Sequence, residues 1–178
     1  MNKKFALIFC LPLLVTLAFA FTPKQPHYKA NVYVIKETVY GTETIASHNI
    51  ITDIGERYAR NLLGFDNVTA NNATKWIALG NSTADAGDTK LDTEATSLGF
   101  TRALGTVTAW DNSGDKAYNV TYKFTATGNI QINATALQWS GVSNSDNNCY
   151  AISGLGGSQD FQNNWNCTII WVVTYNFN

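Results

Sequence analysis

Strict alternation of apolar and polar residues over residues 117–127 is the feature that most constrains the fold. The apolar positions are Tyr118, Val120, Tyr122, Phe124 and Ala126. A repeat of two places these side chains on one face of an extended strand and the intervening polar ones on the other. Comparable segments, rich in β-branched and aromatic residues and bounded by turn residues, lie at 32–40, 42–50, 75–79, 100–110, 129–139, 149–153 and 167–177.

Only one segment has helical spacing. Asp53 and Glu56 have the spacing of a capping box, and apolar residues follow at Ile54, Tyr58 and Leu62 before Gly64. The chain therefore predicts an all-β fold, a jelly-roll or immunoglobulin-like β-sandwich of about eight strands with one short helix near 53–63. The last strand, 167–177, is apolar on both faces, which is typical of a strand that is buried centrally or covered by a partner.

The N-terminus has the pattern of a secretory signal. Two lysines precede an apolar run from Phe5 to Phe21, and Ala18-Phe19-Ala20 offers small residues for cleavage. We expect residues 1–20 to be the signal peptide, 21–31 an extended arm, and 32–178 a single β-sandwich domain. An uncleaved anchor is the alternative, since 17 apolar residues are the shortest run that spans a bilayer. With the signal removed, we expect no membrane span and an extracellular or cell-surface location.

Charge argues against nucleic acid as a partner. The chain has 12 basic and 13 acidic residues, and loss of Lys3 and Lys4 leaves 10 − 13 = −3. Such a balance gives no basic surface for phosphates. Charged residues are 14% of the chain, whereas asparagine and threonine number 20 and 21, so neutral polar groups replace charge on the surface.

Six Asn-X-Thr sequons follow the signal, namely Asn67, Asn72, Asn81, Asn119, Asn133 and Asn166. Asn119 and Asn133 fall on the polar sides of alternating strands, and the others in loops or at strand ends. A glycan at any of them would point into solvent, so we expect N-glycosylation in a host that performs it.

Two cysteines remain after the signal. Cys149 and Cys167 are 18 residues apart, each at the start of an apolar run, in a chain that leaves the reducing cytosol. We expect them to form a disulfide; the alternative is that both are small buried apolar residues. Zinc is disfavoured, because His27 and His48 both lie in the N-terminal quarter.

No motif indicates catalysis, and we expect neither an enzyme nor a cofactor. The chain has no Gly-X-Ser-X-Gly elbow, and Gly154-Leu155-Gly156-Gly157 fits a flexible loop better than a phosphate-binding motif. The carboxylate pairs that a glycosidase would need, Asp92 with Glu94 or Glu37 with Glu43, fit solvated surface acids better. Two acidic turns, 85–92 and 111–115, are weak calcium candidates, and we assign no metal site.

Sugar binding is an alternative role. Trp165 lies in the polar run Asn163-Asn164-Trp165-Asn166, where an exposed indole could stack on a sugar of a surface glycan. The competing interpretation is a tryptophan packed over the edge of the sandwich. A lectin-like or adhesion module is therefore the second functional hypothesis.

Three motifs, WIALGNST (76–83), TKLDTE (89–94) and FTRALGTV (100–107), resemble a pattern in small tail-type structural proteins of tailed viruses and related secreted archaeal proteins. The resemblance covers about residues 50–177. It implies a β-sandwich with a structural or surface role and no catalytic residue. Viral tail proteins are assembled inside the cell, so the signal peptide favours a cell-surface protein over a virus tail-type one.

The leading hypothesis is a secreted, glycosylated, noncatalytic subunit of an extracellular assembly such as a pilus-like filament or surface coat, whose partners are copies of itself. The strand that follows the arm, with Val32, Tyr33, Val34 and Ile35, could add to the sheet of a neighbouring subunit. The alternative is that this strand pairs within its own domain.

Overall fold

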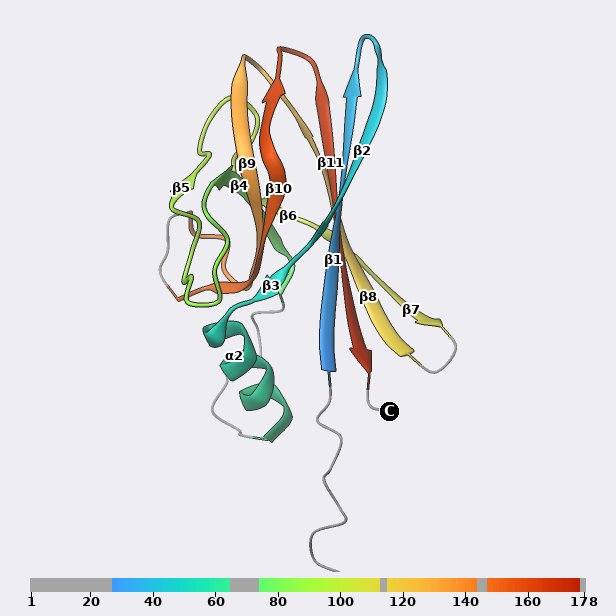
Figure 1. Cartoon of the computed structure of the whole chain (residues 1–178), viewed down its shortest axis with the longest axis vertical. Coiled ribbons are helices and arrows are strands. Elements are labelled where there is room, and N and C mark those ends of the chain that lie inside the picture. The colour runs from blue at the N-terminus through green and yellow to red at the C-terminus, as the bar shows by residue number, and fades with distance from the viewer. Residues whose placement is uncertain (1–26, 65–73, 113–114, 144–146, 177–178) are drawn as a thin grey trace, which may run out of the picture.

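Two antiparallel sheets packed face to face form the core of the molecule (Figure 1). The computed structural model describes residues 27–64, 74–112, 115–143 and 147–176. Sheet A has the order β2-β1-β11-β8-β7, and sheet B has the order β3-β10-β9-β4-β5 with β6 paired to β4. The predicted β-sandwich is confirmed, with eleven strands in place of about eight because three are only two residues long.

The strands of sheet A are long. They are β1 (His27–Thr38), β2 (Gly41–His48), β7 (Thr106–Asn112), β8 (Asp115–Thr125) and β11 (Asn166–Asn176). Those of sheet B are β3 (Ile50–Ile51), β4 (Trp76–Asn81), β5 (Thr93–Glu94), β6 (Ala103–Leu104), β9 (Ile130–Gln138) and β10 (Cys149–Phe161). The first and last strands are neighbours in sheet A, because β1 pairs along its length with β11.

The main apolar core lies between the sheets. Trp171 of β11 is fully buried there, and Phe100 contacts Phe161 edge-to-face with ring centroids 5.0 Å apart. Burial of such aromatic side chains contributes most of the driving force for packing one sheet on the other.

A second apolar cluster covers the other face of sheet B. Ala134 and Ala136 of β9 lie in it with Leu91 of the 82–92 segment, and Ile54 of the helix packs against it. Thr135 and Leu137, on the opposite face of β9, are also fully buried. The expected polar, solvent-facing side of 129–139 is therefore wrong at Thr135 and Leu137, since Leu137 lies in the main core, while the 82–92 segment and the helix cover the face that carries Ala134 and Ala136.

The predicted helix is confirmed as α2 (Asp53–Gly64), but its cap differs from the expectation. The Thr52 hydroxyl, fully buried, accepts the Gly55 backbone N–H at 3.0 Å, and the Thr52 carbonyl accepts the Glu56 N–H at 2.9 Å. Thr52 is thus the N-cap in place of Asp53. Gly55 lies against the Tyr150 carbonyl of β10, an approach that leaves no room for a Cβ atom.

Two element boundaries differ from the sequence expectation. Residues 27–31, assigned to the arm, belong to β1, since β11 supplies a hydrogen-bonding edge as far as Asn176; residues 21–26 lie outside the described part. Likewise Gly154–Gly157 is not a flexible loop. It is a bulge inside β10, where pairing with β9 shifts between Gly154 and Gln159, and Gly156 and Gly157 adopt positive φ angles of 72° and 140°.

Candidate assembly surface

The β1–β2 hairpin is attached to the rest of sheet A through one ladder. Residues 27–37 of β1 pair with 176–166 of β11, while β2 on the other side pairs only with β1 in that sheet. Within the single chain, the alternative that the N-terminal strand pairs in its own domain is therefore the observed arrangement.

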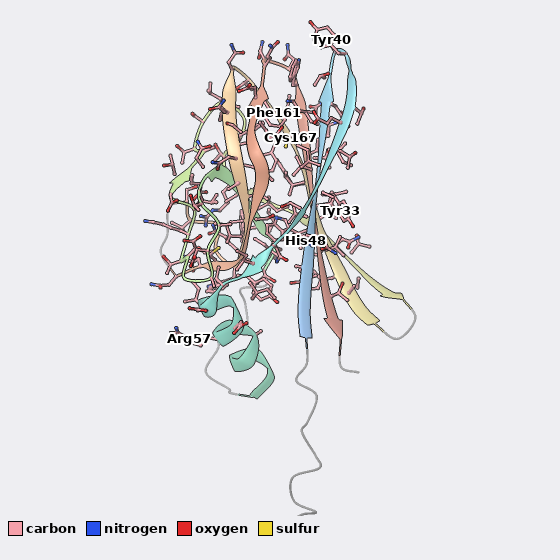
Figure 2. All side chains as sticks on the ribbon, in the orientation of Figure 1. Tyr33, Tyr40, His48, Arg57, Phe161 and Cys167 are labelled. Atoms are coloured by element: carbon pink, nitrogen blue, oxygen red, sulfur yellow. The ribbon has the colours of Figure 1, made fainter. Side chains whose placement is uncertain are left out.

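The four residues predicted to mediate strand exchange divide between two faces of β1. Val32 and Val34 have no exposed surface and lie in the core opposite Trp171 and Ile169. Tyr33, which is 38% exposed, and Ile35 point away from sheet B. Figure 2 shows Tyr33 on that side of sheet A. The alternating residues thus act as core anchors on one face and surface groups on the other.

The hairpin is joined to the body at a short connection. Asn49 is the single residue between β2 and β3, and β3 pairs with β10 of sheet B. The Nδ2 atom of Asn49 is buried without a hydrogen-bond partner among the described residues. Leaving a buried donor unpaired costs about 1–3 kcal/mol, and contact of this donor with water would remove that cost.

The tip of the hairpin carries two exposed apolar side chains. Val39 is 80% exposed and Tyr40, labelled at the tip in Figure 2, is 90% exposed. The preferred residues of two-residue hairpin turns are Asn, Asp and Gly, so local turn chemistry does not explain Val-Tyr.

Two interactions hold the tip end of β1 against the body. Lys36 Nζ lies 5.1 Å from the Phe161 ring centroid and 5.4 Å from that of Trp165. Trp165 is half-buried and packs against the core. This packing agrees with the interpretation of Trp165 as a tryptophan over the edge of the sandwich, and a cation–π contact occupies one side of its indole. The alternative, stacking on a surface glycan, stays a prediction.

Glu37 is the second such contact. Its carboxylate accepts Lys123 Nζ at 2.6 Å and Asn166 Nδ2 at 3.1 Å. These two hydrogen bonds lower the pKa of Glu37, and the bond from Lys123 has the larger effect. Both side chains of the ion pair are well exposed, at 50% and 39%, so the pair guides register more than it stabilises.

The outer face of sheet A carries what we call the outer strip: Tyr33, Ile35, Ile170 and Val172. Tyr33 is the Cα partner of Ile170, and the four side chains are half-buried or exposed with no element of the described chain stacked on them. The expectation that the last strand is buried centrally is confirmed, since β11 is the middle strand of sheet A; its inward residues lie in the core, and Ile170 and Val172 on its outward face belong to this strip.

The sequons lie in different settings. Asn67 and Asn72 are outside the described residues. Asn81 is exposed at the end of β4, and Asn119 is half-buried on the outer face of sheet A. Glycosylation itself stays a prediction at all of them.

Two other sequon side chains take part in the fold. The Oδ1 atom of Asn133 accepts the Ser82 backbone N–H at 2.9 Å. Asn166 accepts the Thr125 hydroxyl at 2.8 Å while its Nδ2 donates to Glu37. A glycan at either position would have to be compatible with these bonds.

The predicted disulfide is wrong. Cys149 and Cys167 are both buried free thiols. Cys149, at one end of β10, lies opposite Gln138 of β9, and Phe161, at the other end, lies opposite Ile130. Gln138 and Ile130 are eight residues apart along β9, a distance of about 26 Å. Cys167 follows Phe161 across the β10–β11 turn, so the two sulfurs lie at opposite ends of the sandwich, far beyond the roughly 7 Å Cα limit of a disulfide. The buried-apolar alternative holds.

Burial also determines the chemistry of these thiols. Desolvation, the main cause in each case, raises the pKa of Cys149 and of Cys167 to about 12. Neither thiol is in the thiolate form near neutral pH, which disfavours both metal binding and redox chemistry.

The acidic turn at 85–92 is internally hydrogen-bonded. Asp88 accepts the Asp85 N–H at 2.8 Å, Asp85 accepts the Gly87 N–H at 2.8 Å, and Asp92 accepts the Ser82 hydroxyl at 3.1 Å. Burial raises the pKa of Asp88. No group of three metal-binding side chains gathers among the described residues; the side chains of the second turn, 111–115, lie outside them.

In each nominated carboxylate pair one member is bound to a cation: Glu37 accepts a hydrogen bond from Lys123, and Glu94 accepts one from Arg102. An open pocket of about 340 Å³ lies at the end of sheet B nearest the β10–β11 turn, lined by Asn129, Ile130, Gln131, Asp160, Phe161 and Gln162. Its one carboxylate, Asp160, accepts Gln131 Nε2 at 2.8 Å. The pocket therefore lacks the opposed acid pair of a glycosidase.

Sequence reasoning missed the buried ion pair of Glu94 and Arg102. The guanidinium bonds both carboxylate oxygens, with Nε–Oε1 at 2.8 Å and Nη2–Oε2 at 2.6 Å, and the side chains are 0% and 1% exposed. The remaining Nη1 donates to the carbonyls of Ser140 and Val142. This pair ties β5 to the segment before β6 and to the loop after β9, and the only signal was two opposite charges eight residues apart in a chain with few charges.

No protein-family model, characterised sequence or solved structure matches this chain. In the part of the chain that the structure describes, no helix has the length and apolarity to span a bilayer.

Proposed function

We propose that the chain is a secreted, noncatalytic structural subunit of an extracellular assembly, a pilus-like filament or surface coat, whose copies join by exchanging the β1–β2 hairpin. The observation that carries this proposal is that, within sheet A, the hairpin is attached only through its ladder with β11, with Val32 and Val34 as core anchors. The exchanging unit is the hairpin and not the first strand alone, because only Val39 and Tyr40 separate β1 from β2.

Exchange preserves the native contacts. A hairpin from a second copy would make the same ladder with β11 and fill the same core positions, so the closed and exchanged forms differ mainly at the connection and in chain entropy. The donated hairpin and the slot that accepts it are different surfaces, so the contact is head-to-tail. Head-to-tail contacts that do not close into a ring produce open filaments.

Two local features support opening of the connection. A single residue links β2 to β3, and short hinge loops of this kind favour domain swapping. The unpaired Nδ2 of Asn49 gains a partner if the link opens to solvent. At the other end of the hairpin, the exposed Val39 and Tyr40 offer a further apolar contact with the receiving copy.

The register of sheet A supplies a direct test. Ile170 is the Cα partner of Tyr33 on β1 and of Thr121 on β8. All three lie on the outer face, where introduced cysteines are open to an oxidant. Directly opposite residues in an antiparallel ladder have Cα atoms about 4.5–5.5 Å apart, within disulfide range.

We expect mature Tyr33→Cys/Ile170→Cys chains, oxidised at a concentration where negative-stain images show filaments, to give a covalent ladder on a non-reducing gel. A mixture of the two single variants should give covalent heterodimers. The matched control is Ile170→Cys/Thr121→Cys, which joins two strands of the body and should remain a covalently closed monomer. Crosslinked monomers alone from the first variant, or a ladder from the control as well, would overturn hairpin exchange.

A further inference from the structure

The outer strip is an apolar surface without cover in the described chain, and one sequon lies beside it. Asn119 is the Cα partner of Val172, and its side chain is on the same face of sheet A. One row further along, Thr121 pairs with Ile170, which in turn pairs with Tyr33. Asn119 is therefore adjacent to the strip in the sheet, with Tyr33 two strands, about 10 Å, across.

We infer that an N-linked glycan on Asn119 lies along the outer strip and covers it. The inference is independent of hairpin exchange and requires only export through a glycosylating pathway. The proposed cover of the outer strip is thus the chain's own glycan and not a sheet of a second copy.

The chemistry of the face suits a sugar. Threonines flank the apolar side chains in the same rows, with Thr168 opposite Ile35 and Thr121 opposite Ile170. A pyranose ring has a face lined by C–H groups and a rim of hydroxyls, so it can bury the former against Tyr33 or Ile170 and hydrogen-bond the latter to threonines. A second apolar sheet would leave those hydroxyls without partners.

The position of the sequons supports the glycan over a second copy. Asn166 is also on the outer face of sheet A, at the opposite end of the strip. A glycan at either end would prevent two sheets from stacking flat. Asn81, by contrast, is exposed on β4 of sheet B, which makes it a control sequon away from the strip.

The experiment compares glycosylated and bare chains as dilute monomers. The mature chain is produced in a secretory host that adds short uniform N-glycans and, in parallel, in a bacterium that adds none; glycopeptide masses report occupancy of Asn119, and near-UV circular dichroism reports Tm. Asn119→Gln and Thr121→Ala each remove this sequon by a different change. Both should lower Tm of the glycosylated chain by about 2–4 °C more than they do in the bare chain.

Two further variants make the result specific. Replacing Tyr33 and Ile170 with threonine should abolish the extra loss of Tm, because the apolar contact is gone, and Asn81→Gln should show no extra loss. The inference is overturned if Asn119 carries no glycan in the folded, secreted chain, or if the extra loss persists without Tyr33 and Ile170. It is overturned equally if the fully glycosylated monomer dimerises through this face, since a second copy would then be the cover. A null result leaves hairpin exchange untouched, because Tm is measured below the assembling concentration.

Discussion

Replacing Arg102 with methionine should lower the unfolding temperature of this protein strongly, although the residue lies far from any surface we assign to assembly. The substitution removes the guanidinium and leaves the Glu94 carboxylate, 1% exposed, without its charged partner. It also removes the donor to the carbonyls of Ser140 and Val142, at 2.7 and 2.6 Å. Breaking a buried ion pair by deleting one member costs about 3–5 kcal/mol.

For a domain of this size, each kcal/mol corresponds to about 2–4 °C, so the expected loss of Tm is about 6–20 °C. Thermal unfolding followed by tryptophan fluorescence or near-UV circular dichroism measures it. A control is Lys123→Met, which breaks the Lys123–Glu37 pair. That pair has the same 2.6 Å separation but is exposed, and we expect its loss to leave Tm almost unchanged.

A double-mutant cycle separates charge pairing from packing. Glu94→Leu/Arg102→Met removes both charges, so it should be less destabilised than the sum of its single variants by roughly 1–3 kcal/mol. Strict additivity, or a loss for Arg102→Met as small as that for Lys123→Met, would refute the argument that burial makes this pair important.

Three further outcomes follow from the structure. At pH 8 both native thiols should react with a thiol reagent only as fast as the protein unfolds, because burial raises their pKa values to about 12; rapid modification of either folded-state cysteine would contradict this. Because the pKa of Glu37 is lowered, its carboxylate binds fewer protons in the folded state than in the unfolded state. Its contribution to stability is therefore present above the unfolded-state pKa and is lost as pH falls through the folded-state pKa. Lys123→Met should make the free energy of unfolding depend less on pH in this acid range, as urea unfolding at several pH values would reveal. Gly55→Ala should destabilise by about 1–3 kcal/mol despite the better helix propensity of alanine, because the added Cβ meets the Tyr150 carbonyl, whereas Gly154→Ala, with open space around it, should have little effect in the same urea titration.

The local repeat of the sequence was enough for the class of fold and for several elements. The alternation over 117–127 corresponds to β8, the 53–63 spacing corresponds to α2, and the two-sided apolarity of 167–177 corresponds to β11 with its core face and outer strip. These succeed because side-chain periodicity directly reports backbone geometry and burial on each face.

Elements that depend on a partner were less predictable. β1 begins five residues before the expected start because β11 offers hydrogen bonds there, and β10 continues through a glycine run that a positive-φ bulge accommodates. Neither cause is local. The N-cap is Thr52 and not the expected Asp53, and this too depends on another element, because the Thr52 hydroxyl is held near the Tyr150 carbonyl of β10.

The sequence by itself determined that this chain builds strands with one short helix, carries few charges and has six sequons, because each is a property of consecutive residues. Only the tertiary structure decided which residues meet. It set Cys149 and Cys167 at opposite ends of the sandwich, brought Glu94 to Arg102 out of water, and laid Asn119 beside Val172. Strand order and register bring residues distant in sequence into contact, and no repeat within a strand encodes which neighbour will lie beside it.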